Sequence, residues 1–258
     1  MYLEHKGINI FYTDDGQGEA VVFLHGFLEN ATMWTVFIPK LSQSNRIVTI
    51  DLLGHGKTGC LGYVHTMELM AEIVETVLKH LQINKSIIIG HSMGGYVALA
   101  FAKKNPEALN GLCLMNSTPN ADTSEKKKNR DRAILAVKQN HKTFIRMAIG
   151  NLFSPENRTI FSEKIIALIT DAQQTPLQGI VAALEGMKIR KSRKELFHSA
   201  HYKKMLIISK KDPVLNYKQL KSQTENTNVE IVEFPDGHMS HIENEEFFLQ
   251  HIVYFIEN

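Results

Sequence analysis

The sequence predicts an α/β fold built on a mostly parallel sheet, and three observations predict it. Short apolar runs alternate with stretches of helical periodicity over the first 116 residues. One run, 87–89, is three consecutive isoleucines, which suits a strand buried on both faces of a parallel sheet. Glycine, serine, aspartate and histidine directly follow several of these runs, and the carboxyl ends of strands are where such sheets place their sites.

Composition narrows the class of protein. The chain has 258 residues, 43% of them hydrophobic and 22% charged, which are ordinary values for a globular protein. A net charge of +2 gives no general attraction to nucleic acid or to an anionic membrane. Residues 1–6 do not show the basic region followed by a long apolar run that is typical of a signal peptide. No stretch reaches the roughly 18 apolar residues of a membrane span. Two cysteines, Cys60 and Cys113, are too few for a disulfide framework, so we expect a cytoplasmic protein.

The first part of the chain predicts strands and helices in alternation. Residues 7–15 alternate in polarity and run into turn residues at 14–18, which predicts an edge hairpin closed by that turn. The apolar runs predict strands over 21–24, 47–50, 86–89 and 111–115. Helical spacing predicts helices over 34–41, over 67–81, and after Ser92 as far as the Asn105-Pro106 pair.

The alternation stops after residue 116 and resumes near residue 202. Between them we expect only helices, at 124–140, 142–152, 155–172, 176–188 and 192–197. The lysines and arginines of 126–132 are interpreted as a solvated helix face. Strands follow at 205–208 and 229–234, with a helical piece at 217–221, and a last helix starts near Asn244. The chain is therefore a parallel sheet interrupted once by a helical block.

Residues 90–94, Gly-His-Ser-Met-Gly, fit the G-x-S-x-G pattern of a nucleophile elbow. The pattern fixes only three positions, but here it stands between a strand-like and a helix-like run, as the motif requires. A side chain at either glycine would collide with the neighbouring strand or helix. The turn would present the Ser92 hydroxyl above the sheet, so Ser92 is the predicted nucleophile.

A serine nucleophile needs a base and a third group that orients the base. His238 is the predicted base because it follows a glycine at a strand end, and His241, three residues on, is its rival. Asp212 follows the 205–208 run and takes the acid position in the order Ser, acid, His. Asp236 is the rival acid and is expected to shape a turn. Asn116 also ends a predicted strand, but its side chain is an amide and not an acid, which favours Asp212.

The oxyanion hole requires two N–H donors. Met93, directly after the nucleophile, supplies one, and Phe27, in the loop after the 21–24 strand, is the candidate for the second. Both act through backbone atoms.

Three further histidines, His25, His55 and His91, lie near the same edge of the predicted sheet and are expected to support turns. They do not pair with cysteines or carboxylates at zinc-ligand spacing, so we expect no metal and no cofactor.

Several motifs together resemble the α/β-hydrolase fold superfamily, in its single-domain, capped form, over nearly the full chain. They are His25-Gly26-Phe27, Asp51-Leu52-Leu53-Gly54-His55-Gly56, Gly90–Gly95, Asp212-Pro213-Val214, and Gly237-His238 with Glu243 five residues on. The resemblance implies a core domain of residues 1–116 and 202–258. Residues 117–201 would form a helical cap, inserted after the sixth strand, that shapes the substrate pocket. Which of five apolar cap residues face that pocket stays open: Phe144, Met147, Phe153, Leu177 and Ile180.

Within that superfamily the site residues favour a carboxylesterase. Dehalogenases and epoxide hydrolases resemble this chain but carry Asp where Ser92 stands. C–C bond hydrolases more often have Asn at His91, a lyase-type synthase has Arg at Tyr96, and perhydrolases often have Thr at Met93. We therefore expect cleavage of small-to-medium carboxylic esters. A C–C hydrolase or lyase-type reaction is the alternative, and a ligand-sensing receptor is a further one. The expected partner is a small-molecule ester, and both a monomer and a homodimer remain open.

Overall fold

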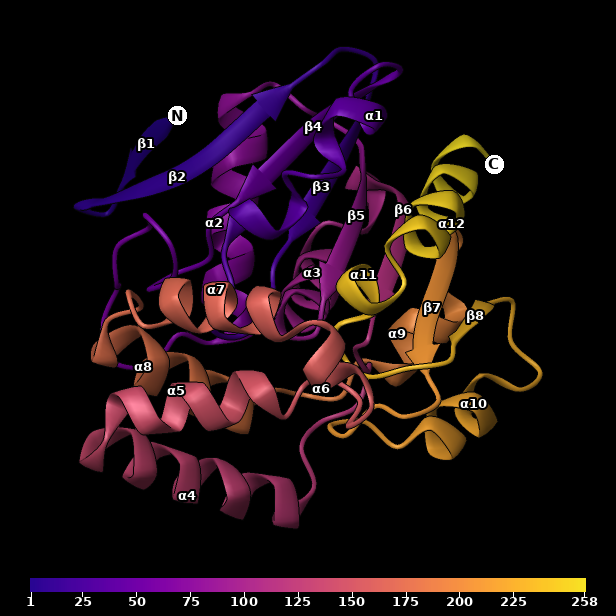
Figure 1. Ribbon diagram of the computed structural model, residues 1–258. Helices are drawn as coiled ribbons and strands as arrows, with labels where there is room; N and C mark the ends of the chain where they lie inside the picture. Colours follow the sequence, from indigo (N-terminus) through magenta and orange to yellow (C-terminus); the bar gives the residue numbers. More distant parts are fainter.

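An eight-stranded sheet organises the chain in a computed structural model that describes residues 1–258 (Figure 1). The strand order is β1-β2-β4-β3-β5-β6-β7-β8. The pairs β1–β2 and β2–β4 are antiparallel and every other pair is parallel. The strands are β1 (Tyr2–His5), β2 (Ile8–Asp15), β3 (Glu19–Leu24), β4 (Asn45–Ile50), β5 (Ser86–His91), β6 (Leu109–Met115), β7 (Lys203–Ser209) and β8 (Glu230–Phe234).

The predicted edge hairpin exists, but its turn lies elsewhere. β2 pairs with β1, and the turn between them is at Lys6 and Gly7, both with positive φ. Residues 14–18 instead link β2 to β3, which do not pair because β4 lies between them. The prediction missed β1 because its four residues are largely exposed and carry little apolar signal.

Helices cover both faces of the sheet, and most expected helices are present with shifted ends. The stretch predicted as one helix over 34–41 is two short turns, and the one over 155–172 is broken at Phe161. The helices are η1 (Ala31–Trp34), α1 (Ile38–Leu41), α2 (Met67–His80), α3 (Met93–Lys104), η2 (Pro106–Ala108), α4 (Ser124–Gln139), α5 (His141–Gly150), α6 (Asn157–Ile160), α7 (Ser162–Ala172), α8 (Leu177–Lys188), α9 (Lys194–Ser199), α10 (Tyr217–Thr224), α11 (Ser240–Glu243) and α12 (Glu245–Glu257). None of them combines the length and the apolar character needed to cross a membrane.

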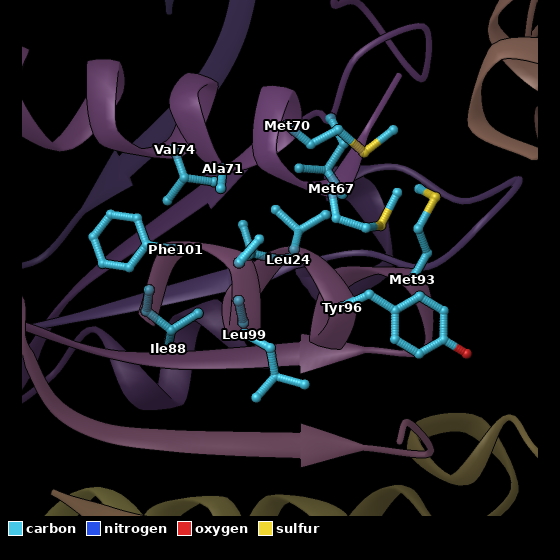
Figure 2. Close-up of a cluster of buried hydrophobic side chains, with 14 of the residues drawn as sticks. Leu24, Met67, Met70, Ala71, Val74, Ile88, Met93, Tyr96, Leu99 and Phe101 are labelled. Atoms are coloured by element: carbon cyan, nitrogen blue, oxygen red, sulfur yellow. The ribbon is translucent and has the colours of Figure 1, made fainter. Parts of the chain in front are cut away.

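Two hydrophobic cores lie on opposite faces of the sheet, and β5 contributes to both. Ile88 packs in the larger core with α2 and α3, whereas Ile87 and Ile89 pack in the smaller one with α1 and α12. Figure 2 shows Ile88 among side chains of the larger core, including Leu24 and Phe101. The run of isoleucines is thus the two-residue alternation of a strand with apolar layers on both sides.

Most of the helices between β6 and β7 gather at one end of the sheet, whereas α9 lies beside β7 (Figure 1). α4, α5, α7 and α8 lie beyond the carboxyl ends of the parallel strands (Figure 1). That edge is also where the strand-end loops of β3, β5, β7 and β8 emerge, so the candidate site residues lie between the sheet and these helices.

Candidate active site

Ser92 occupies a strained turn between β5 and α3. Its φ of 48° and ψ of −110° are unusual for a non-glycine residue. The flanking glycines explain how the turn fits. A Cβ on Gly94 would lie 2.4 Å from the Leu24 carbonyl oxygen, and one on Gly90 would lie 2.5 Å from the backbone of Gly94. The sequence therefore folds here into the tight strand-to-helix turn that the motif predicts.

His238 and Asp212 form a buried hydrogen-bonded pair. The Nδ1 of His238 lies 2.7 Å from Oδ2 of Asp212, and both side chains are at most 2% exposed. The backbone N–H groups of Val214 and Leu215 donate to the other carboxylate oxygen at 2.8 and 3.0 Å. Burial raises the pKa of Asp212, but the attraction of His238 and these hydrogen bonds prevail and lower it. The acid is thus held ionised against the ring it orients.

Ser92 and His238 line the same cavity, of about 170 Å³. The Ser92 hydroxyl makes no hydrogen bond within the protein. The hydrogen bond between a catalytic serine and its base is often long in substrate-free enzymes and shortens when the substrate binds. The Met93 N–H lies at the first turn of α3, at the positive end of the helix dipole. Phe27 also lines the cavity, so the structure brings all five predicted site residues to one place.

The rival residues have other surroundings. Both ring nitrogens of His241 are buried without a partner, and burial lowers its pKa to about 3, so it stays neutral among aromatic rings. Asp236 accepts a hydrogen bond from Asn244 and another, through its backbone, from Lys211, which fixes a turn as expected. The Nε2 of His25 accepts from the Leu52 N–H, a supporting role.

Glu29 is a site residue that the motifs did not reveal. Its Oε2 accepts the Gly26 N–H at 2.6 Å and lies 2.7 Å from Nδ1 of His91. The other ring nitrogen of His91 lies 3.1 Å from the His238 carbonyl oxygen. The pair therefore ties the loop that carries Phe27 to the loop that carries His238. Glu29 lies five residues after β3 in a stretch without periodicity. Its charge is therefore the only feature of the sequence that could have drawn attention to it.

Two further residues hold the base and the acid. Asn116, with a φ of 42°, donates to Asp212 at 3.1 Å and to Ser209 at 2.8 Å. Its Oδ1 accepts from Ser240 at 2.6 Å. Glu243 accepts the N–H of Met239, the residue after His238, at 3.3 Å, and the Ser154 N–H at 3.0 Å. The amide at Asn116 thus supports the acid on the next strand.

The cavity wall consists of different apolar residues from those the sequence singled out. Ala148, Ile149, Leu152 and Met187 line it. Met147 and Leu177 are exposed, while Phe153 and Ile180 are fully buried elsewhere, and Phe144 packs partly buried against the larger core. Helical spacing identifies an apolar face, but it does not say whether that face meets a cavity or a neighbouring helix.

Known proteins resemble this chain in sequence and in structure. A putative 2-succinyl-6-hydroxy-2,4-cyclohexadiene-1-carboxylate synthase of Bacillus subtilis is 33% identical over 48% of this chain and 46% of the relative. A pimeloyl-[acyl-carrier protein] methyl ester esterase of Sodalis glossinidius is 34% identical over 43% of this chain and 42% of the relative. These matches span less than half the length of either relative. A thermophilic esterase from Thermogutta terrifontis, solved with malate bound, superimposes with a TM-score of 0.91, at 28% identity, over 99% of this chain and 96% of that one.

The model of the alpha/beta hydrolase fold family matches residues 19–245. That range contains the elbow at Ser92, the strands around it and His238. The chain therefore belongs to the alpha/beta hydrolase fold family.

Proposed function

We propose that this protein is a serine hydrolase that cleaves small-to-medium carboxylic esters. The observation that carries the proposal is the buried 2.7 Å contact of His238 with Asp212 beside a cavity that Ser92 also lines. The esterases among its relatives and structural neighbours support it.

In this proposal Ser92 attacks the ester carbonyl while His238 takes the hydroxyl proton. Asp212 holds His238 in the tautomer that leaves its Nε2 free to act, since Nδ1 is engaged. The N–H groups of Phe27 and Met93 hold the oxyanion. His238 then protonates the departing alcohol, and water releases the acyl group by the same steps.

We also propose that residues 117–201 act as a cap over a core of residues 1–116 and 202–258. The support is that α5 and α8 supply Ala148, Ile149 and Met187 to the cavity wall, while α3 and the strand-end loops supply the rest. A cavity of about 170 Å³ favours short acyl chains.

The test is a chain-length series of p-nitrophenyl esters, measured on the wild type and on Ser92→Ala. We expect turnover that is highest for short chains and that falls at least about a thousandfold in the variant. Full activity in Ser92→Ala would refute the proposal.

A lyase-type or C–C bond reaction is the second candidate, and the similarity to the putative synthase favours it. Against it stands Tyr96, where the resemblance to such synthases calls for Arg. Turnover of a vinylogous diketone that exceeds turnover of every simple ester would decide for this alternative.

A further inference from the structure

The basic stretch of α4 is not uniformly a solvated face. Lys127, Lys128 and Arg132 are exposed as predicted, but Arg130 lines the cavity with Ser92. Lys126 lies one turn earlier on the same face of the helix, since residues four apart are neighbours. The sequence could not separate the two faces because both carry cations.

Arg130 has unused donors at the cavity. Its Nε donates to Asp122 at 2.5 Å, and the other N–H groups of the guanidinium have no partner in the protein. A guanidinium presents five N–H donors in a planar fork that matches a carboxylate. The side chain is only 19% exposed, so most of its surroundings are protein.

Lys126 adds a second half-buried cation. Its Nζ makes one long hydrogen bond, 3.4 Å, to the carbonyl oxygen of Val214, and Val214 lines the cavity. Burial lowers the pKa of Lys126, and the nearby Arg190 and Arg130 lower it further, against the attraction of Asp122 and Asp212. A nearby anion would relieve this repulsion.

The third cation, Arg190, is held by several protein groups and shares Asp122 with Arg130. It lies 4.0 Å from the Tyr96 ring centroid, 2.7 Å from Asp122, and it donates to two backbone carbonyls. Asp122 thus serves two arginines at once. The three cations Arg130, Lys126 and Arg190 stand against two nearby carboxylates, Asp122 and Asp212. Glu29 is paired with His91, so an excess of positive charge remains beside Arg130.

We propose that Arg130 and Lys126 form a carboxylate-binding subsite, so that the ester cleaved by this protein carries a carboxylate remote from the scissile bond. This inference rests on the proposed esterase function. The guanidinium would bind the substrate carboxylate through its free N–H groups while Asp122 and Arg190 hold it in place. The carboxylate can belong to the acyl part or to the alcohol part, and the substrates below distinguish these cases.

The test compares charged esters with neutral counterparts in which a methyl group replaces the carboxylate. Monomethyl adipate against methyl hexanoate tests the acyl side, and the acetate ester of gamma-hydroxybutyrate against butyl acetate tests the alcohol side. We expect kcat/KM to be at least about tenfold higher for the charged member of one pair, since hydrogen bonds between charged groups have that strength. Added salt should reduce this preference.

Substitutions test whether the preference for charged esters comes from Arg130 and Lys126. Arg130→Met, and separately Lys126→Met, should reduce the charged-to-neutral ratio of kcat/KM by about tenfold, mainly through KM. The matched control is Lys128→Met on the exposed face of α4, which should keep the ratio. A loss of activity that is equal for charged and neutral esters would show a purely structural role for Arg130 and overturn the proposal.

The carboxylate subsite and the esterase function can be refuted separately. Activity that depends on Ser92 but shows no charge preference in either pair overturns the subsite and leaves the esterase proposal intact. Absence of turnover on every ester, neutral ones included, refutes the esterase function itself.

Discussion

The buried pair of Glu29 and His91 allows a quantitative prediction for Glu29→Gln. The variant removes the charge but keeps an acceptor for the Gly26 N–H. Burial raises the pKa of Glu29, but the attraction and the hydrogen bond of His91 outweigh it and hold the pKa at about 2, below the usual 4.5. Because a pKa unit corresponds to about 1.4 kcal/mol, we expect the variant to lose about 3 kcal/mol of unfolding free energy near neutral pH.

The loss should depend on pH, and the sign follows from His91. In the wild type Glu29 raises the pKa of His91 above 6.5 against the effect of burial, so His91 contributes stability below that pH, which is lost as pH rises through its folded pKa. Without Glu29, burial dominates and lowers the pKa of His91. The variant then loses stability as pH falls below 6.5. The deficit should therefore grow between pH 8 and pH 5.5, by about 1 kcal/mol.

Urea unfolding of the wild type and Glu29→Gln at pH 8 and pH 5.5 measures this deficit. Glu225→Gln is the matched control, because Glu225 is exposed and should change stability by less than about 0.5 kcal/mol at either pH. A deficit that is equal at both pH values, or smaller at pH 5.5, would refute the coupling of Glu29 to His91.

Three other predictions concern the acid Asp212, the turn at Gly94, and the buried His241. Asp212→Asn should lower kcat on a short ester about ten-thousandfold without unfolding the protein, as circular dichroism would check; near-normal kcat would assign the acid elsewhere. Gly94→Ala should destabilise the protein by about 3 kcal/mol because of the backbone clash, whereas Gly150→Ala, with open space around its Cβ, should raise stability by about 0.5–1 kcal/mol in thermal unfolding. Because the folded pKa of His241 is about 3, the wild type should lose about 2 kcal/mol of unfolding free energy through His241 as the pH falls from 6.5 to 5. His241→Phe should abolish this loss and retain esterase activity, whereas loss of turnover would make His241 the base instead.

The fold class was predictable because strands buried on both faces leave a strong local signal. Ile87 and Ile89 point to one core and Ile88 to the other, so the run is apolar throughout. The exposed strand β1 leaves no such signal, and the pairing of β2 with β4 depends on residues more than thirty positions apart.

The sequence by itself determined the strand-to-helix turn at Ser92, because only glycines fit at positions 90 and 94, and it placed Asp212 and His238 at strand ends. Only the tertiary structure decided what surrounds these residues. Glu29 meets His91 across 62 positions and Asn116 meets Asp212 across 96, and such contacts leave no local periodicity. The same reason holds for α4, where helical spacing cannot tell which cations meet solvent and which, like Arg130, face the cavity.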